Sequence, residues 1–310
     1  MLTRSVSVII PAFNCAAWLG KTLDSCLLQG GYIKEIIVVD DYSTDNSREV
    51  LEEYQGRFPD LIRVYSNEKK GGNNARNFGF SQSTGQYIQW LDADDQLEDG
   101  KLETQLRLFS SDPSIDIVYS DWKLITYEGD TVVRTELKRN RQYKDYLFEL
   151  LTNNWSAPHS YLLKRSVAER LHEIKAWNPA TAVYQDREYF TMAALEGARF
   201  AYTPGYFAVY NRWNRVSVSA AKTEVRYEYF EKILSRFEDL LHQEGGPFAG
   251  RTAVYQHILT TQKLLIRGAG FPATIRYRES GLPNLSWRMV KGVRTTVRFI
   301  REYFKWKFSE

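Results

Sequence analysis

The chain has 310 residues, of which 43% are hydrophobic and 25% charged, and its net charge is +3. This composition supports a full hydrophobic core in one main domain with an appendage, and it excludes a disordered or repeat protein. Only two cysteines occur, and no apolar stretch approaches the roughly 20 residues of a membrane-spanning helix, so a disulfide scaffold and an integral membrane protein are also excluded.

Strands and helices alternate along the N-terminal part of the chain. Apolar, β-branched runs predict strands at residues 6–10, 35–39, 61–65 and 87–91, and helical spacing predicts helices at 16–28, 45–54 and 73–80. Pro11 is expected to stop the first strand. This alternation is typical of βαβ units in a mostly parallel sheet covered on both faces. Residues 116–134 are strand-like around a Glu128-Gly129-Asp130 turn, so we expect a mixed sheet.

Three carboxylates follow the predicted strand 87–91 within one short turn, Asp92-Ala93-Asp94-Asp95. Carboxylates this close repel one another unless a cation lies among them. A hard divalent ion such as Mg²⁺ or Mn²⁺ takes oxygen ligands, commonly one or two carboxylates plus substrate phosphates. The alternative is a solvated turn in which an aspartate caps the following helix. The end of a buried strand favours a ligand site, because α/β sheets bind ligands there.

Two common nucleotide-binding signatures are missing. The first strand-to-helix turn reads Pro11-Ala12-Phe13-Asn14-Cys15, without the glycine-rich fingerprint of dinucleotide-binding proteins, and no Walker sequence occurs. A dehydrogenase or a kinase is therefore disfavoured.

Four segments carry a resemblance to a known family: residues 5–14 (SVSVIIPAFN), 38–47 (VVDDYSTDNS), 72–79 (GNNARNFG) and 91–95 (LDADD). In this order they are similar to the motifs of the inverting family 2 glycosyltransferases. The resemblance implies an α/β, GT-A fold, with a Rossmann-like, mostly parallel mixed sheet flanked by helices. We expect this catalytic domain at residues 1–220 and a C-terminal helical extension at 221–310.

The resemblance implies roles for residues near a nucleotide. Pro11 and Phe13 lie in the loop that lines the nucleotide pocket, and Asp41 matches the acceptor for the imide N–H of the base. Arg76 lies beside the nucleotide, where a guanidinium serves the base edge or the diphosphate. Two alternatives stay open: residues 40–45 form a turn with a helix N-cap, and Arg76 is an exposed helix residue.

Within the acidic turn, Asp92 and Asp94 match the D-x-D pair of the family. The resemblance places Asp94 nearest the metal and Asp92 toward the ribose and metal-bound water. Asp95 is an additional carboxylate, so which two of the three bind the metal stays open.

Displacement with inversion requires a base on the acceptor hydroxyl. The family supplies it at the start of a helix, and Tyr184-Gln185-Asp186-Arg187-Glu188, before the predicted amphipathic stretch 189–195, matches this position. Asp186 aligns with the catalytic aspartate, whereas Gln185 replaces the commoner glutamate. Glu188 is the second candidate. The alternative is that Asp186 is a carboxylate favoured only by the helix dipole.

Acceptor contacts are implied by position alone. Trp155 and His159 lie where the family lines its acceptor face, and the alternatives are a core tryptophan and a buried polar histidine. Residues 210–219 resemble the loop that closes over the donor. Trp213 stands where many members place a histidine, so Arg212 or Arg215 is expected to supply the positive charge.

The C-terminal region has a different character. Helical apolar spacing occurs at residues 223–243 and 248–267, and residues 287–310 contain seven Lys/Arg against two Glu, a net charge of +5. A basic amphipathic helix at about 285–307 is typical of a peripheral anchor on an anionic membrane. A helix packed on the catalytic domain and a homodimer contact are the alternatives. Nucleic-acid binding is not expected, because no reader fold accompanies the stripe.

The combined prediction is a metal-dependent transferase that uses Mn²⁺ or Mg²⁺ and a UDP-, GDP- or dTDP-sugar, with UDP favoured. It adds one sugar to a glycan or lipid-linked saccharide in surface polysaccharide biosynthesis. Val209 replaces the glutamine of the processive Q-x-x-R-W motif, which favours single transfer. We expect a cytoplasmic, soluble or peripheral protein. The alternatives are a polyprenyl-phosphate sugar transferase, a sugar-1-phosphate nucleotidyltransferase, which lacks support because its glycine-rich first loop is missing, and an inactive membrane-associated scaffold.

Overall fold

The computed structural model describes residues 5–152, 155–213 and 223–242, together with 255–256, 258–260 and 262–263. The chain divides into two compact units. The first comprises Met1–Lys144 and Ser156–Ala221, and the second comprises Asp145–Trp155 and Lys222–Glu310. The expected basic tail at 285–307 lies outside the described residues.

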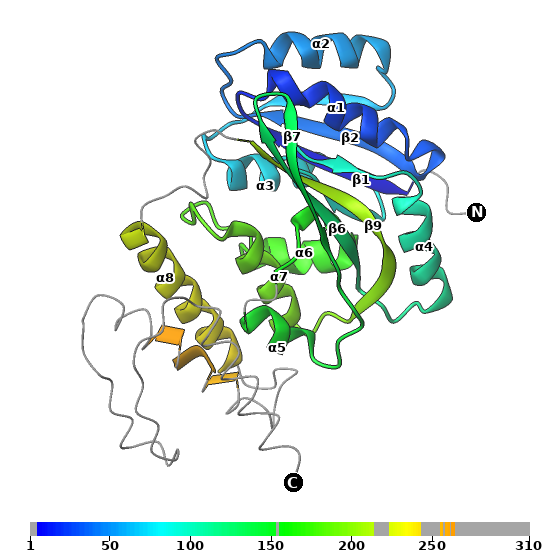
Figure 1. The fold of residues 1–310 in the computed structure, drawn as a ribbon. Helices are drawn as coiled ribbons and strands as arrows, with labels where there is room; N and C mark the ends of the chain where they lie inside the picture. The colour runs from blue at the N-terminus through cyan, green and yellow to red at the C-terminus, as the bar shows by residue number, and fades with distance from the viewer. Residues whose placement is uncertain are drawn as a thin grey trace, which may run out of the picture. The chain divides into compact units, whose positions relative to one another are not determined.

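Nine strands of the described residues form one mixed sheet in the first unit, in the order β3-β2-β1-β4-β8-β6-β9-β5, with β7 paired to β6 (Figure 1). The strands are β1 (Val6–Ala12), β2 (Ile33–Asp40), β3 (Ile62–Ser66), β4 (Tyr87–Trp90), β5 (Gln96–Leu97), β6 (Ile117–Glu128), β7 (Thr131–Lys138), β8 (Tyr161–Lys164) and β9 (Phe200–Trp213). The segment β3-β2-β1-β4 is parallel, as expected, and β8, β7 and β5 each pair in the antiparallel sense. The expected mixed sheet is confirmed.

Helices cover both faces of the parallel segment. The first unit contains α1 (Ala16–Leu27), α2 (Ser47–Arg57), α3 (Gly72–Gln82), α4 (Lys101–Ser111), α6 (Arg165–Glu173) and α7 (Gln185–Leu195), with short 3₁₀ turns η1 (Gly30–Tyr32) and η2 (Pro158–Ser160). The predicted helices at 16–28, 45–54 and 73–80 therefore correspond to α1, α2 and α3, with ends that differ by at most three residues.

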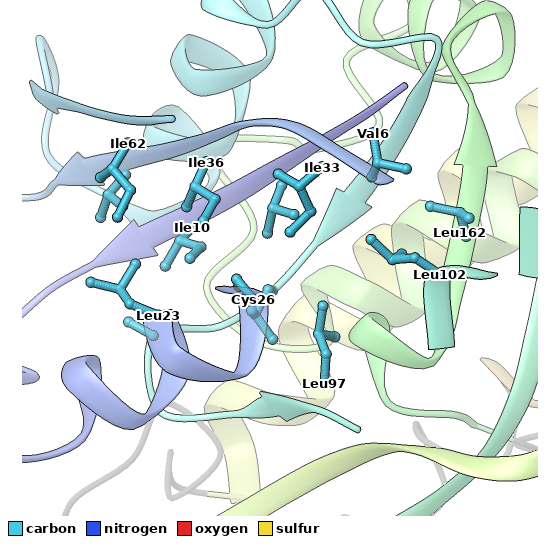
Figure 2. Close-up of a cluster of buried hydrophobic side chains, with 14 of the residues drawn as sticks. Val6, Ile10, Leu23, Cys26, Ile33, Ile36, Ile62, Leu97, Leu102 and Leu162 are labelled. Carbon is cyan, nitrogen blue, oxygen red and sulfur yellow. The ribbon is translucent and has the colours of Figure 1, made fainter. Parts of the chain in front are cut away.

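Alternate residues of β1 pack against opposite layers, as a strand requires. Val8 and Ile10 belong to the large core cluster with α1, α2 and α4, which Figure 2 shows around Ile10, Leu23 and Leu102. Ile9 faces α3 on the other side, where a Cβ added to Gly79 would lie 2.7 Å from the Ile9 side chain. The glycine therefore lets α3 approach the sheet closely.

The first strand does not stop at Pro11 but continues to Ala12, so that prediction is wrong. The carbonyl of Ile9 accepts from Leu91 on the β4 side, and Pro11 has the same orientation two residues later. Pairing with β4 ends at Ile9 and Trp90. The missing N–H of Pro11 therefore points to a side where no ladder bond is needed, while its pairing with Val39 of β2 continues.

The second unit contains α5 (Tyr146–Leu151) and α8 (Thr223–Leu241), which corresponds to the predicted helix at 223–243. Asp145 caps α5 by accepting from the Phe148 N–H at 2.9 Å, and it also accepts from the Tyr255 hydroxyl. Buried side chains of this unit include Phe230, Leu234, Phe237, Ile258 and Leu259. In the part of the chain that the structure describes, no helix has both the length and the apolar character to span a bilayer.

Candidate active site

The carboxyl ends of β1, β2 and β4 meet at one edge of the sheet. Ala12 lies opposite Asp40, and Ile9 lies opposite Trp90, so the residues after each strand emerge together. The order of the strands reverses here, because β1 continues to β2 on one side and to β4 on the other. This topological switch point is where open α/β sheets bind ligands.

Asp41 follows β2 and is buried, with its carboxylate held in a fixed position. It accepts from Asn67 Nδ2 at 2.7 Å and from the Gly71 N–H at 2.8 and 2.9 Å. Gly71 has φ 126°, a conformation open to glycine, and this turns its N–H toward Asp41 at the start of α3. Asp41 is therefore a rigid acceptor, as the predicted contact with a base requires.

The helix-capping alternative for residues 40–45 applies to Asp45 rather than to Asp41. The Asp45 carboxylate accepts from the Ala16 N–H at 3.1 Å and the Ser47 N–H at 3.0 Å, the first residues of α1 and α2. Hydrogen bonds from Ser47 and Ala16 outweigh burial and lower the pKa of Asp45. The helix cap and the predicted base contact therefore concern different aspartates of this segment.

Three non-glycine residues at this edge have left-handed backbone conformations. Asn14 has φ 47°, Tyr42 has φ 64° and Tyr184 has φ 62°. They lie directly after β1, after β2 and before α7, and such conformations cost about 1–3 kcal/mol each. Strain of this kind clusters at ligand sites, which supports a functional role for these loops.

The loop after β1 carries the predicted residues Pro11 and Phe13. Pro11 is half-buried within the strand, whereas the Phe13 ring is 46% exposed. The Lys70 ammonium lies 5.3 Å from the centre of this ring. Lys70 directly precedes Gly71, whose N–H donates to Asp41, so this ring lies near the Asp41 carboxylate. An exposed aromatic ring beside a fixed carboxylate is suited to binding a planar heterocycle.

Arg76 is not an exposed helix residue, so that alternative is wrong. Its side chain is buried in α3, and its guanidinium donates to Asp92 at 2.6 Å and to Gln185 at 3.1 Å. It also lies 4.6 Å from the centre of the Trp177 ring. One side chain therefore joins the acidic turn to the start of α7, which holds the predicted base.

The three carboxylates of the acidic turn have different environments. Asp92 is 31% exposed, Asp94 is half-buried, and the Asp95 side chain is 2% exposed. Asp95 accepts from the Asn211 N–H at 2.8 Å, and Asn211 Nδ2 donates to the Asp94 carbonyl at 2.8 Å. Asn211 of β9 thus fixes the turn at two points, and Asp95 faces the core.

No aspartate of the turn caps the next helix. β5 intervenes, α4 begins at Lys101, and its N-cap is Gly100 with φ 73°. The helix-capping alternative for the acidic turn is therefore wrong. The partly exposed carboxylates of Asp92 and Asp94 need another explanation.

His159 is fully buried below the turn. Its Nδ1 lies 3.3 Å from Asp95 Oδ2. Burial lowers the pKa of His159 to about 3 and outweighs the nearby Asp92 charge, so the ring is neutral at pH 7. This favours the interpretation of His159 as a buried polar residue over a contact with an acceptor hydroxyl.

The start of α7 presents Asp186 and buries Glu188. Asp186 is the second residue of the helix and is half-buried, whereas Glu188 is fully buried. The expected amphipathic pattern is wrong, because every residue from Arg187 to Leu195 is buried. Burial lowers the pKa of the Arg187 guanidinium to about 10. Of the two candidate bases, Asp186 is the more accessible.

Tyr210 was predicted only as the first residue of a loop at 210–219, but residues 210–213 belong to strand β9, and 214–219 lie outside the described residues. Burial is the main cause that raises the pKa of Tyr210, followed by four carboxylates: Asp95, Asp92, Asp186 and Asp94. The turn and Asp186 therefore lie around one protonated phenol. The ring is also 6.4 Å from His159 and 6.2 Å from Trp122. Only the alternation along β9 offers a signal for it in the sequence, and that signal does not identify a partner.

The remaining predicted residues are not all brought together. Trp213 packs against Trp18 at 5.0 Å and stacks on Tyr127 at 4.0 Å between ring centres. Arg212 is exposed, and Trp155 belongs to the second unit. Arg215 lies outside the described residues.

Within the described residues, no group of three or more His, Cys, Asp or Glu side chains is arranged to hold a metal ion. The turn instead offers the oxygen atoms of Asp92 and Asp94 at a partly exposed edge. Two carboxylates with a substrate diphosphate form a ligand set that Mg²⁺ and Mn²⁺ accept.

Comparison with known proteins places this geometry in a family. The profile of Glycosyl transferase family 2 matches residues 7–171, more than half of the chain. An uncharacterized glycosyltransferase of Nostoc sp. is 27% identical over 228 residues, 71% of this chain and 69% of its own length. The chondroitin synthase of Pasteurella multocida is 31% identical over 173 residues, 56% of this chain and 16% of the synthase. The minor teichoic acid biosynthesis protein GgaB of Bacillus subtilis is 37% identical over 116 residues, 36% of this chain and 13% of GgaB.

Solved structures agree with the fold. S. aureus TarS 1-349 in complex with UDP-GlcNAc has a TM-score of 0.64 at 19% identity, covering 86% of this chain and 73% of TarS 1-349. The mannosyltransferase PcManGT from Pyrobaculum calidifontis, in complex with GDP-Man and Mn²⁺, has a TM-score of 0.55 at 18% identity, covering 88% of this chain and 77% of its own. The strands and loops that converge on Arg76 and the acidic turn are thus those of a GT-A fold, and the chain belongs to glycosyl transferase family 2 as a glycosyltransferase.

Proposed function

We propose that the chain transfers a single sugar, with inversion, from a nucleotide-diphosphate sugar to a hydroxyl group of a glycan or lipid-linked saccharide. One observation carries this proposal. The buried Arg76 donates to Asp92 of the acidic turn and to Gln185 at the start of α7. A single side chain therefore contacts both the proposed donor site and the residue next to the proposed base.

The nucleotide binds between the loops after β1 and β2. Asp41, held by Asn67 and Gly71, accepts the imide N–H of the base, and the exposed Phe13 ring contacts the heterocycle. A UDP-sugar is favoured, in keeping with the UDP-GlcNAc bound by TarS, although PcManGT binds GDP-Man. Uracil presents an imide N–H and guanine a ring amide N–H, so the carboxylate alone does not choose between these two bases.

A divalent ion fits the two carboxylates that face the edge. Asp94 and Asp92 supply hard oxygen ligands, whereas Asp95 is directed to Asn211 and His159 and is not proposed as a ligand. PcManGT was solved with Mn²⁺, which supports this assignment. When bound, such an ion neutralises negative charge on the departing nucleoside diphosphate.

Asp186 is proposed as the base. Its carboxylate takes the proton of the acceptor hydroxyl while the acceptor oxygen forms a bond to the anomeric carbon and the bond from that carbon to the diphosphate breaks. The helix dipole of α7 favours the ionised carboxylate that this role needs. Burial and the surrounding carboxylates raise the pKa of Tyr210, so its phenol keeps its proton beside the proposed base.

We assign the transfer reaction to surface polysaccharide biosynthesis. The names of the chondroitin synthase and of GgaB support this assignment, although the chain spans only a small part of either protein. Val209 in place of the processive glutamine supports single transfer. The basic segment at 285–307 is proposed to bind an anionic membrane surface on the cytoplasmic side, where a lipid-linked acceptor lies.

Thermal-shift titration tests the donor assignment. UDP, GDP and dTDP are each added with Mn²⁺ and with EDTA, and we expect one nucleotide to stabilise the protein only with the metal. Incubation of the matching nucleotide sugar with saccharide acceptors, followed by NMR of the product, then reports the anomeric configuration. Absence of stabilisation by all three nucleotides, or a product with retained configuration, contradicts the proposal.

A further inference from the structure

The β6–β7 hairpin leaves one strand edge unpaired in the described part of the chain. β6 pairs with β9 on one side and with β7 on the other, and no described strand pairs with the outer edge of β7 (Figure 1). Six of the eight residues of β7 are exposed. An exposed edge of this kind presents free N–H and C=O groups that can pair with another strand.

The same strand exposes large apolar side chains. Val132 is 50% exposed, Val133 is 47% exposed and Leu137 is 55% exposed. The register shifts between Thr126 and Tyr127, which leaves Val133 as an extra residue of β7 and turns two adjacent valines to solvent. Three exposed apolar side chains on an unpaired edge indicate a contact surface.

The charges on β7 determine which partner fits. Arg134, Glu136 and Lys138 alternate along one face, and within the strand Glu136 contacts both Arg134, at 3.3 Å, and Lys138, at 2.7 Å. When two copies of β7 lie antiparallel with a two-fold axis at Thr135, Arg134 of each copy faces Glu136 of the other. Opposite charges directly across strands are favourable.

Neighbouring registers lack this match. An axis at Arg134 places arginine opposite arginine, and an axis at Glu136 places glutamate opposite glutamate and Arg134 opposite Lys138. Because directly paired residues share a face, these are the adjacent registers that an antiparallel pair can adopt. The strand is therefore self-complementary in one register.

We propose that β7 is a dimerisation edge, at which a second copy of this chain adds its own β7 antiparallel about an axis at Thr135. The dimer extends the sheet from one protomer into the next. Backbone hydrogen bonds supply the pairing, the Arg134–Glu136 pairs fix the register, and the apolar side chains add contact area.

Disulfide trapping in the full chain tests the register. Directly opposite residues of an antiparallel pair have Cβ atoms about 4.5–5.5 Å apart, close to disulfide geometry, so Thr135→Cys is expected to form a covalent dimer on mild oxidation. Val133→Cys is the matched control, because the two copies of residue 133 would lie roughly 13 Å apart along the strands. Burial raises the pKa of the native Cys15 to about 11 and that of Cys26 to about 12, so neither thiol is expected to interfere.

Charge reversal tests the pairing without a new thiol. In analytical ultracentrifugation, Arg134→Glu is expected to raise the dimer dissociation constant about tenfold, and Arg134→Glu combined with Glu136→Arg is expected to restore it. Lys138→Glu is the control, because it also removes a contact that Glu136 makes within the strand but lies outside the proposed Arg134–Glu136 pairs between the copies. Circular dichroism melts of each variant verify that the fold is retained.

Two results would overturn the proposal. The first is a chain that stays monomeric at concentrations up to 100-fold above those of the trapping experiment. The second is trapping that is as efficient at residue 133 as at residue 135, or a dissociation constant that responds equally to Arg134→Glu and Lys138→Glu.

Discussion

Replacing Asp95 with Asn tests whether the third carboxylate of the acidic turn is structural. Its side chain is 2% exposed and lies between the Asn211 N–H at 2.8 Å and His159 Nδ1 at 3.3 Å. Hydrogen bonds to charged groups contribute about 1.5–3 kcal/mol, and the amide keeps one acceptor oxygen. We therefore expect the free energy of unfolding to fall by about 2 kcal/mol, which for a domain of this size lowers Tm by roughly 4–8 °C.

Asp94→Asn is the matched variant, because it makes the same chemical change one residue away. The Asp94 contact with Asn211 uses the backbone carbonyl, which the substitution leaves in place. We expect its Tm without ligand to change by less than about 2 °C, since partly exposed substitutions usually change stability by about 0.5 kcal/mol or less.

Differential scanning fluorimetry with and without nucleotide and Mn²⁺ separates the two roles. Asp95→Asn should be less stable yet keep most of its nucleotide-induced shift, whereas Asp94→Asn should keep its stability and lose that shift. The opposite pattern, with a stable Asp95→Asn protein that no longer responds to nucleotide, would show that Asp95 is a ligand and that the structural assignment is wrong.

Three further predictions concern other residues. Asp186→Asn should lower kcat by about 10²–10⁴-fold while leaving nucleotide-induced stabilisation intact, and the buried Glu188→Gln should mainly lower Tm; equal losses of rate in steady-state assays would contradict the assignment of the base. Burial raises the pKa of Glu35, but hydrogen bonds from Ser7 and Thr84 and the Arg63 charge bring it below 4.5, so its stabilising effect is present above that pH and is lost as the pH falls through the lower folded-state value. Glu35→Gln should therefore destabilise the protein at pH 7 in urea melts, with a difference from wild type that shrinks in acid; a constant difference contradicts this linkage. Removal of residues 285–310 should abolish flotation with anionic liposomes, and flotation of the truncated protein would exclude the proposed anchor.

The local pattern of apolar residues was sufficient to predict the strands and helices that position the site. The strands at 6–10, 35–39, 61–65 and 87–91 and the helices between them were predicted within a few residues, because each is a continuous apolar run or a regular helical stripe. The Pro11 error arose because the sequence does not show on which side a strand lacks a partner. Pro11 is tolerated because the side on which its N–H is missing faces β4, and the pairing with β4 has already ended at Ile9.

Residues that connect the site could not be predicted in the same way. Asn211 holds the acidic turn across a separation of 116 positions, and Arg76 reaches Gln185 across 109. Neither contact has a periodic signal, because each depends on the packing of several elements at once. The same holds for Asp95, which the sequence presents as one of three equivalent carboxylates, and for Tyr210, whose neighbours come from four separate segments.

The charge balance at this edge explains why donor and cation are expected to bind together. Asp92, Asp94 and Asp186 are partly exposed at the proposed site, and Arg76, a cation beside them, already donates to Asp92. A doubly negative diphosphate that entered alone would meet carboxylates of its own sign, and a low local dielectric would strengthen the repulsion. A dication bound with the diphosphate reverses the sign of that interaction, and each ligand then raises the affinity of the other by the same factor. We therefore expect the protein to respond to nucleotide only in the presence of Mn²⁺.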